Sequence, residues 1–365
     1  MNDDNIEEIT AERFDRTVGV IHRKFTEFNI LDSNVLFGSE DVMNSYIQRI
    51  IQRTGHSVTA AAPVMNAMTL QGDRITVTYE REVSLPGPTI DIRKFTRQPY
   101  TITHLLELGA MSRLMAAYLW VLFDAKAFET TAINSLMCLT NPRWKIVSIE
   151  ETPELKIPHY RWERLFTRTS SMISDSANYD ITIMDLIKAS LRMRPDFEIV
   201  GEVRGEEAFA LFQSAATGHG GLTSFHASSV ESALGRLSAE PINIRASQQM
   251  LLWFVLHITR MRNDKKQIVR RVASISEVIP RHEGRVELDE IFRYDIKKNS
   301  FGTETLQELI KKSQRLQQAA DLLNIDNLQG DLKTRMYLIE QCLKNNAKKI
   351  DDVFAILGRY YSWTE

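Results

Sequence analysis

The chain has 365 residues, of which 43% are hydrophobic and 25% charged, and its formal net charge is −2. This composition fits a folded protein of two domains and excludes a polycation that binds nucleic acid along its whole length. Cys138 and Cys342 lie far apart within apolar helical patterns, so we expect free thiols in a reducing compartment. No apolar run approaches the roughly 20 residues that cross a bilayer, and the acidic start MNDDNIEEIT is unlike a signal peptide. These features favour a cytoplasmic protein.

Residues 1–98 have the pattern of a small α+β domain. Ser39 precedes a run whose apolar side chains share one helical face, which predicts a helix with a serine N-cap. Two strand-like segments, 75–85 and 89–95, follow and are separated by a proline-glycine-proline turn. We expect a linker at residues 99–103.

Residues 104–290 alternate between helical and strand patterns. The short apolar run 197–200 lies between two helical patterns, as in a parallel sheet that helices cover on both faces. The basic run 260–271 is typical of a solvated strand-turn-strand edge, although such a run could also contact anionic lipid or nucleic acid. Residues 291–365 are almost purely helical in pattern. The predicted fold class is therefore α/β, with an N-terminal α+β domain and a helical C-terminal region.

Polar residues follow the predicted strands of the core. Glu202 comes directly after the 197–200 strand, at the edge of the sheet where α/β proteins bind ligands. The others are an acidic loop after a strand-like run and two histidines beside small residues: Glu150, Glu151 and Glu154, then His219 and His226. Each has a structural alternative. The glutamate could cap a helix, the acidic loop could simply be solvated, and the histidines could be a core residue and a turn residue.

The order of these motifs resembles the type II/IV secretion ATPase superfamily, most closely the archaeal branch that powers archaella and type IV pili. The similarity covers almost the whole chain and is carried by GPTIDIRKF, IVSIEETPELKIPHYRW, RPDFEIVGEVRG and TGHGGLTSFHASS. Each segment is weak alone, but their order and spacing are specific. The resemblance implies a RecA-like P-loop NTPase core (αβα), an N-terminal domain that is shortened relative to the family, and a helical C-terminal appendage.

The resemblance also implies roles for single residues. Glu150, Glu151 and Glu154 match the acidic box, in which a carboxylate orients or deprotonates the attacking water, with Glu151 where the family usually has aspartate. Glu202 and Arg204 match the residues that follow the Walker B strand, where the carboxylate acts on Mg²⁺ or on its water. These four carboxylates are the implied catalytic residues.

Further residues match positions that contact nucleotide in the family. His219 and His226 resemble γ-phosphate sensors, and Thr130 falls at the hydroxyl position that binds Mg²⁺ together with the Walker B glutamate. Arg74 and Arg93 match N-terminal arginines that reach the nucleotide, a task that suits the planar guanidinium, although they could be plain strand-surface arginines. The implied cofactors are ATP and Mg²⁺.

The phosphate-binding loop of the family is missing. A G-x-x-x-x-G-K-[ST] sequence should stand near residues 123–130, and it does not. In one alignment Glu129 replaces the lysine and Phe128 a glycine; in the other, about ten residues of strand and loop are absent. Without glycines the backbone cannot form a cradle for phosphate. A glutamate in place of lysine repels phosphate by about 4 kcal/mol per unit charge, at a distance of about 4 Å and an effective dielectric constant near 20. Lys126 could swing in, but without the loop it is only a point charge.

Loss of the strand before this loop would leave a slot in the sheet. Because unpaired backbone groups in a core are costly, we expect Tyr118–Leu122 to be recruited as a strand.

Two functions follow, and both place the chain in a cytoplasmic motor of a type II/IV secretion, type IV pilus or archaellum-like system. In the first it is a catalytically impaired subunit, a pseudo-ATPase that serves as a scaffold or as a passive member of a hexameric ring. In the second it hydrolyses ATP through a divergent pocket and drives pilin or archaellin assembly. A third interpretation is a sequence-level deletion in an ordinary family member.

The implied partners are identical or paralogous ATPase subunits and a polytopic membrane platform protein. The expected location is peripheral, at the inner face of the cell membrane, without direct membrane insertion. We expect no nucleic-acid partner, because the sequence offers no basic channel with interleaved aromatic residues.

Overall fold

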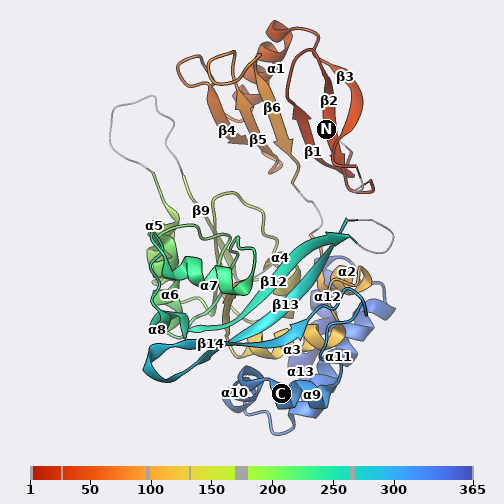
Figure 1. Ribbon diagram of the computed structural model, residues 1–365, viewed down its shortest axis with the longest axis vertical. Coiled ribbons are helices and arrows are strands. Elements are labelled where there is room, and N and C mark those ends of the chain that lie inside the picture. The colour runs from red at the N-terminus through yellow and green to blue at the C-terminus, as the bar shows by residue number, and fades with distance from the viewer. Residues whose placement is uncertain are drawn as a thin grey trace. The chain divides into compact units, whose positions relative to one another are not determined.

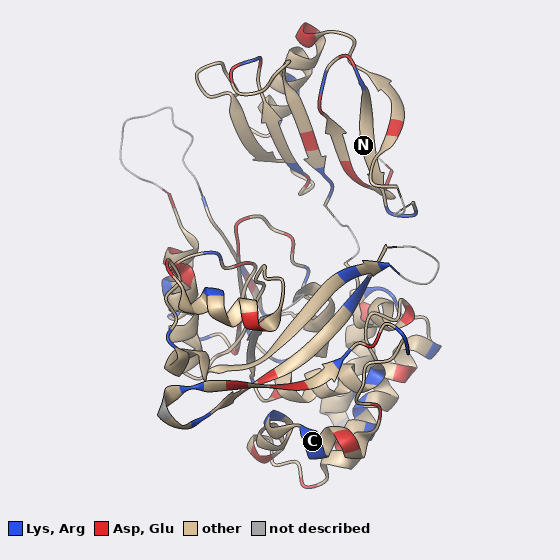
Figure 2. Ribbon diagram, viewed as in Figure 1, with Lys and Arg blue, Asp and Glu red and all other residues tan. Residues whose placement is uncertain are grey.

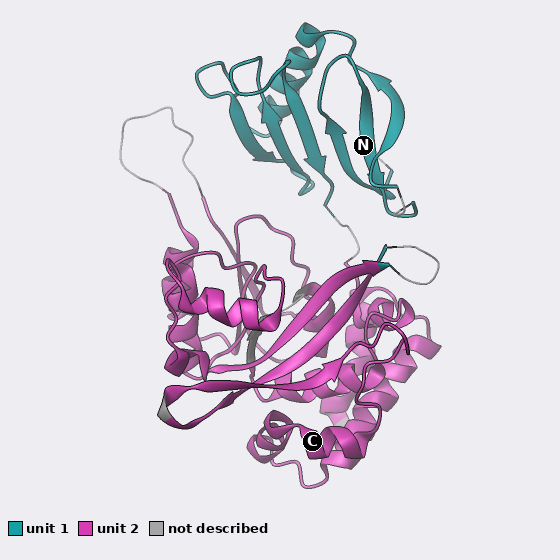
Figure 3. Cartoon of the chain, viewed as in Figure 1, with its two compact units in different colours: residues 1–97, 171–176, 262–268 teal, residues 98–170, 177–261, 269–365 magenta. Residues whose placement is uncertain are grey.

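The computed structural model describes residues 3–25, 28–95, 99–130, 133–168, 180–262 and 268–363 (Figure 1). The chain forms two compact units (Figure 3). The first comprises residues 1–97 together with the short segments 171–176 and 262–268, and the second comprises the remainder. The division at residue 97 falls beside the predicted linker.

The N-terminal unit is a six-stranded sheet with one helix packed on it. The strands, in the order β3-β2-β1-β6-β5-β4, are all antiparallel to their neighbours. Their bounds are β1 Ile6–Ala11, β2 Thr17–His22, β3 Leu31–Leu36, β4 Val64–Met68, β5 Arg74–Thr78 and β6 Thr89–Arg93. The helix α1, Glu40–Gln52, begins at Ser39, whose Oγ accepts a hydrogen bond from the N–H of Val42, and this confirms the predicted helix and its cap. Its apolar side buries Met43 and Ile47 against the sheet.

The second unit contains an eight-stranded sheet in the order β14-β13-β12-β7-β11-β10-β8-β9. The strands from β12 to β9 are parallel, and β14 is antiparallel to β13. Their bounds are β7 Phe128–Thr130, β8 Ile146–Glu150, β9 Trp162–Phe166, β10 Phe197–Val200, β11 Gly220–Thr223, β12 Leu252–Arg262, β13 Ile268–Pro280 and β14 Val286–Arg293. The structure confirms the buried strand at 197–200 and places the described parts of the basic run, 260–262 and 268–271, in β12 and β13.

Helices cover both faces of this sheet, which confirms the α/β class. One face carries α5 Ile183–Ser190, α6 Glu207–Ala216, α7 Val230–Ser238 and α8 Ala246–Gln249. The other carries α2 Ile102–Glu107, α3 Arg113–Asp124, α4 Ile133–Leu136, α9 Leu306–Lys312, α10 Gln314–Leu322, α11 Leu328–Lys344, α12 Ile350–Leu357 and α13 Arg359–Trp363. Two 3₁₀ turns, Met137–Leu139 and His282–Gly284, complete the elements. The strands alternate between the two cores: Phe197 and Ile199 face the α3 side, and Val200 faces the α6 side.

Two predicted boundaries differ from the observed elements. The expected linker 99–103 overlaps the start of α2 at Ile102, and the expected helical region starting at 291 overlaps the end of β14, so that its first helix begins at Leu306. Within the described ranges, no helix combines the length and the apolar character that crossing a bilayer requires. Both cysteines are buried free thiols, as expected.

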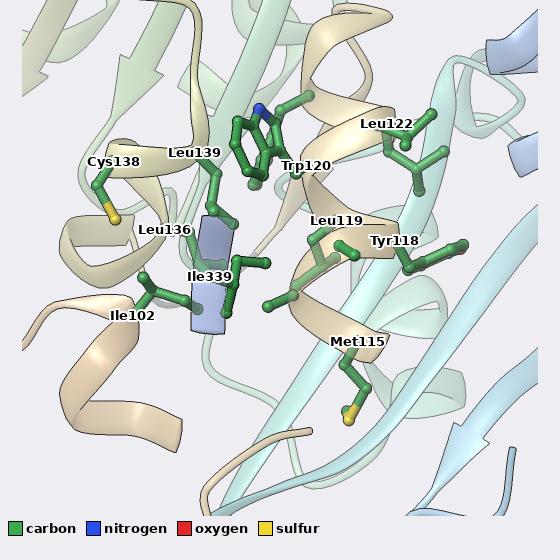
Figure 4. Close-up of a cluster of buried hydrophobic side chains, with 14 of the residues drawn as sticks. Ile102, Met115, Tyr118, Leu119, Trp120, Leu122, Leu136, Cys138, Leu139 and Ile339 are labelled. Atoms are coloured by element: carbon green, nitrogen blue, oxygen red, sulfur yellow. The ribbon is translucent and has the colours of Figure 1, made fainter. Parts of the chain in front are cut away.

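The expected strand at Tyr118–Leu122 is wrong, because these residues lie inside helix α3. The Oγ of Ser112 caps this helix by accepting a hydrogen bond from the N–H of Met115, and every residue from Leu114 to Phe123 is at most 5% exposed. Figure 4 shows Tyr118 and Trp120 on opposite sides of the helix. A helix packed between a sheet and other helices needs no polar side, so its sequence lacks the period that separates a buried helix from a buried strand.

A buried ionic network joins α3 to the C-terminal helices. The Nη1 of Arg335 lies 2.6 Å from Oδ2 of Asp124, and its Nε lies 2.7 Å from Oδ2 of Asp331. The hydroxyl of Tyr361 donates a hydrogen bond of 2.6 Å to the second oxygen of Asp124, and Tyr360 accepts one of 2.8 Å from the arginine. Burial raises the pKa of Asp124, and the arginine partly offsets this. The end of the chain is thereby fixed to the helix that precedes β7.

We predict that Arg335→Gln lowers the free energy of unfolding by about 3–5 kcal/mol, because it leaves two carboxylates buried without a cation. Urea unfolding followed by tryptophan fluorescence measures this, since the Arg335 guanidinium lies 5.1 Å from the ring of Trp120. Arg113→Gln is the matched control. Its ion pair with Glu340 is 3.2 Å long and has 49% and 38% exposed side chains, so the expected loss is below about 1 kcal/mol. Equal losses in both variants would contradict the prediction.

Candidate functional site

Four parallel strands end level with one another at the carboxyl edge of the core sheet. Ile149 of β8 pairs with Val200 of β10, which pairs with Thr223 of β11, which pairs with Thr130 of β7. Ligands bind at this edge in open α/β sheets. The segments that follow the strands therefore bring several of the predicted site residues together.

Glu150, the last residue of β8, is a buried carboxylate that holds the acidic loop in place. It is 3% exposed, and its Oε1 accepts hydrogen bonds from the N–H of Glu154 at 2.7 Å and of Leu155 at 2.8 Å. Its Oε2 has no hydrogen-bond partner among the described residues. Burial raises the pKa of this carboxyl, and the two backbone N–H groups and the charge of Arg164 offset the rise only in part.

Glu202 lies between two cationic or polar partners just after β10. Its Oε2 is 2.6 Å from Nη2 of Arg204, and its Oε1 is 3.5 Å from Nε2 of His226. The Glu202 side chain is 25% exposed, whereas the arginine and histidine side chains are 65% and 89% exposed. A cation at this carboxylate would therefore compete with a guanidinium that is already in contact with it.

The rest of the acidic box is exposed. Glu151 and Glu154 both face solvent on the loop after β8, and the charge of Glu151 acts on Arg204. Asn134 of α4 fixes this loop, because its side chain donates to the carbonyl of Glu154 at 3.1 Å and accepts from the N–H of Lys156 at 2.8 Å. Because the charge of Glu151 acts on Arg204, which pairs with Glu202, Glu151 lies near these two side chains.

The connection from β7 to α4 has no room for a phosphate loop. Thr130 ends the three-residue strand β7, and Ile133 begins the four-residue helix α4, so that only residues 131 and 132 lie between them. The G-x-x-x-x-G-K-[ST] motif has eight residues, and its glycine-rich part lies between strand and helix. Phe128 and Glu129 are strand residues paired with β11 and β12, which favours the alignment in which the loop is deleted. The residues present do not fit a Mg²⁺–ATP group.

His219 does not lie with the other predicted residues. It immediately precedes β11, whereas His226 follows it, and four residues of strand separate the two positions by about 13 Å. His219 lies instead near Asp196, at the amino end of β10, and its charge is one of the effects that lower the pKa of that carboxyl. Lys126 lies at the same amino edge, with its Nζ 3.0 Å from Asp196, so it cannot replace the missing loop lysine in this arrangement.

Arg74 and Arg93 are neighbours in the N-terminal unit. They are directly opposite each other on β5 and β6, and Arg93 is also opposite Glu8 on β1. Like charges in opposite positions repel unless an anion lies nearby, and Glu8, opposite Arg93, supplies one here. The approach of this arginine pair to a nucleotide stays a prediction.

Sequence reasoning missed two side chains that shape the site. The hydroxyl of Ser224, which follows β11, donates a hydrogen bond of 2.5 Å to the carbonyl of Gly201 and so closes the gap between two strand ends. The role of Asn134 could not be predicted from the sequence, because its hydrogen-bond partners lie about 20 residues away in an irregular loop. A cavity of about 670 Å³ lies elsewhere, beside Phe209 and Ile242, and no predicted site residue lines it.

We predict that Glu150→Gln changes the pH dependence of stability. Because the pKa of Glu150 is raised above 4.5, its protonated form stabilises the fold below that pH, and this contribution is lost as the pH rises through the raised pKa. The melting temperature of the wild type should therefore fall relative to that of the variant as the pH increases. Exposed Glu151→Gln is the control, with an expected effect below about 0.5 kcal/mol. A difference between wild type and Glu150→Gln that stays constant from pH 4 to 8 would refute the assignment.

Comparison with known proteins gives a consistent result. The uncharacterized protein MJ0900 of Methanocaldococcus jannaschii is 34% identical over 269 residues, 71% of this chain and 47% of its own length. MJ1287 of the same organism is 40% identical over 204 residues, 53% of this chain and 73% of its own. The crystal structure of the ATPase DotB from Yersinia pseudotuberculosis has a similar fold, with a TM-score of 0.51 and 13% identity over 98% of this chain and 90% of that one. The family model described as type II/IV secretion system protein matches residues 4–325, so the chain belongs to this family.

Proposed function

We propose that the chain is a pseudo-ATPase subunit of a type II/IV secretion, type IV pilus or archaellum-like motor. The observation that carries the proposal is the connection of two residues between β7 and α4. A phosphate cradle needs consecutive backbone N–H groups that point at the anion, with glycines that let the backbone approach. Two residues before a helix of one turn cannot supply them.

The charges at the carboxyl edge support the same conclusion. Glu150 ends β8, Glu151 and Glu202 follow β8 and β10, and Arg204 is already paired with Glu202. In the absence of the loop lysine, this edge repels a triphosphate.

The subunit nevertheless keeps the architecture on which a ring can be built. The core sheet and both helical layers are complete, and β7 occupies the slot between β11 and β12. We infer a scaffold or passive member of a hexameric ring, formed with identical or paralogous ATPase subunits. It would work in the cytoplasm at the inner face of the membrane, beside a polytopic platform protein. The chain spans 47% of MJ0900, so these roles describe the matched part.

Titration of the purified full chain with Mg²⁺–ATP in a calorimeter tests the proposal. We predict no saturable binding up to about 1 mM, which is a free energy of binding no better than about −4 kcal/mol.

Micromolar binding that Glu202→Gln or Thr130→Ala abolishes would refute the proposal and support an active ATPase with a divergent pocket. Glu287→Gln is the matched control for such binding, because Glu287 also pairs with an arginine, Arg281, at 2.6 Å, but on β14. Binding that all three variants retain would also contradict the proposal, and it would place the nucleotide away from the carboxyl edge.

A further inference from the structure

The strands β12 and β13 continue past the rest of the core sheet. On one side β7 pairs with β12 only as far as Val255, and on the other β14 pairs with β13 only from Ser274 onward. Among the described residues, the segments 256–262 and 268–273, called the arm below, therefore have no strand neighbour except each other. At about 3.3 Å per residue, seven residues extend on the order of 20 Å.

The base of the arm is anchored to the core. Leu256 and Val272 are buried with the α3 cluster, and the N–H of Val272 donates to the carbonyl of Ala110 at 2.8 Å. Arg271 helps to anchor the base of the arm, because its Nη1 donates a hydrogen bond of 2.7 Å to the carbonyl of Leu108, at the end of α2. The base of the arm thus has a fixed support on the core.

The distal part is cationic. Arg260 and Arg262 on β12 and Arg270 on β13 are exposed, and none forms an ion pair with a described residue. The segment 260–271 contains six Lys or Arg residues and one acid, Asp264, a balance of +5, although the whole chain has a net charge of −2. Figure 2 shows blue on both strands of the arm and no red. A purely solvated edge would gain solubility from mixed charges, whereas this one presents a single sign.

We propose that the arm binds an anionic phospholipid surface through Arg260, Arg262 and Arg270. Guanidinium groups pair with phosphate oxygens through two parallel N–H bonds, and a projecting ribbon can bring its end to a flat surface. The arm contains no Phe, Tyr or Trp on which bases could stack, which disfavours single-stranded nucleic acid. The inference goes beyond the proposed loss of ATP binding and does not depend on it.

The test is flotation of the full chain with vesicles of phosphatidylglycerol and phosphatidylcholine, compared with vesicles of phosphatidylcholine alone. We expect binding only to the anionic vesicles, and weaker binding as the salt concentration rises. A cation near an anionic surface contributes about fivefold, which is about 1 kcal/mol, so the triple variant R260Q/R262Q/R270Q should bind about a hundredfold more weakly. R161Q/R192Q/K298Q is the matched control, because it removes three exposed cations of the second unit that lie outside the arm.

Each outcome of the flotation test either supports the proposal or overturns it. Loss of binding in the arm variant, with retention in the control and unchanged melting temperatures for both, supports the proposal. Equal binding to neutral vesicles, or equal loss in the two triple variants, overturns it. Binding to duplex DNA or RNA that is stronger than binding to anionic vesicles overturns it in favour of a nucleic-acid surface.

Discussion

The middle of a parallel sheet cannot lose a strand without leaving backbone N–H and C=O groups buried and unpaired. In this chain the strand in question is β7, which lies between β11 and β12 and has only three residues, Phe128–Thr130. Those three residues pair with both neighbours, so the sheet stays continuous. The sheet is preserved, but the connection to α4 becomes too short for a loop that wraps a phosphate.

The same constraint explains why α3 is so deeply buried. A strand of three residues forms few hydrogen bonds and has little surface of its own, so its position depends on the elements around it. α3 ends at Asp124, and Ala125 to Ala127 then turn the chain into β7, with Lys126 at a φ of 56°. Arg335 and Tyr361 hold Asp124 from the C-terminal helices. The end of the chain, far away in sequence, therefore helps to fix the slot that defines the altered site.

Much of this architecture was predictable from the sequence, because short-range patterns mark where many of its helices and strands begin and end. Ser39 marks the start of α1, and the apolar run 197–200 followed by Gly-Glu marks a buried strand and its carboxyl end. The helix α3 was not predictable in the same way, since a segment buried on every side shows no period. The length of the run, twelve residues in the structure, was the better signal than its composition.

The candidate site was predictable in part. Glu150, Glu202 and His226 converge because each ends or follows a parallel strand, and parallel strands end at one edge. His219 lies at the other edge, and the strand between the two histidines, Gly220–Thr223, was visible as an apolar-small segment that should have separated them. The pairing of Glu202 with Arg204 was not visible, since two residues in one irregular segment can point in any direction.

A motor subunit changes its partners' contacts by exchanging the charge of bound nucleotide at such an edge. In this chain the counter-charge of Glu202 is Arg204, which is part of the protein and cannot be hydrolysed or released. Under the proposed function, contacts made by the subunit are then permanent or respond to conditions such as ionic strength. The proposed lipid contact of the arm would respond to ionic strength, and its arginines are carried on strands anchored at Ala110 and Leu108, on the α3 side of the sheet. Because β12 is parallel to β7 and its Val255 lies opposite Thr130, the arm continues β12 past the carboxyl edge, so the proposed lipid contact and the predicted nucleotide site lie on the same side of the sheet.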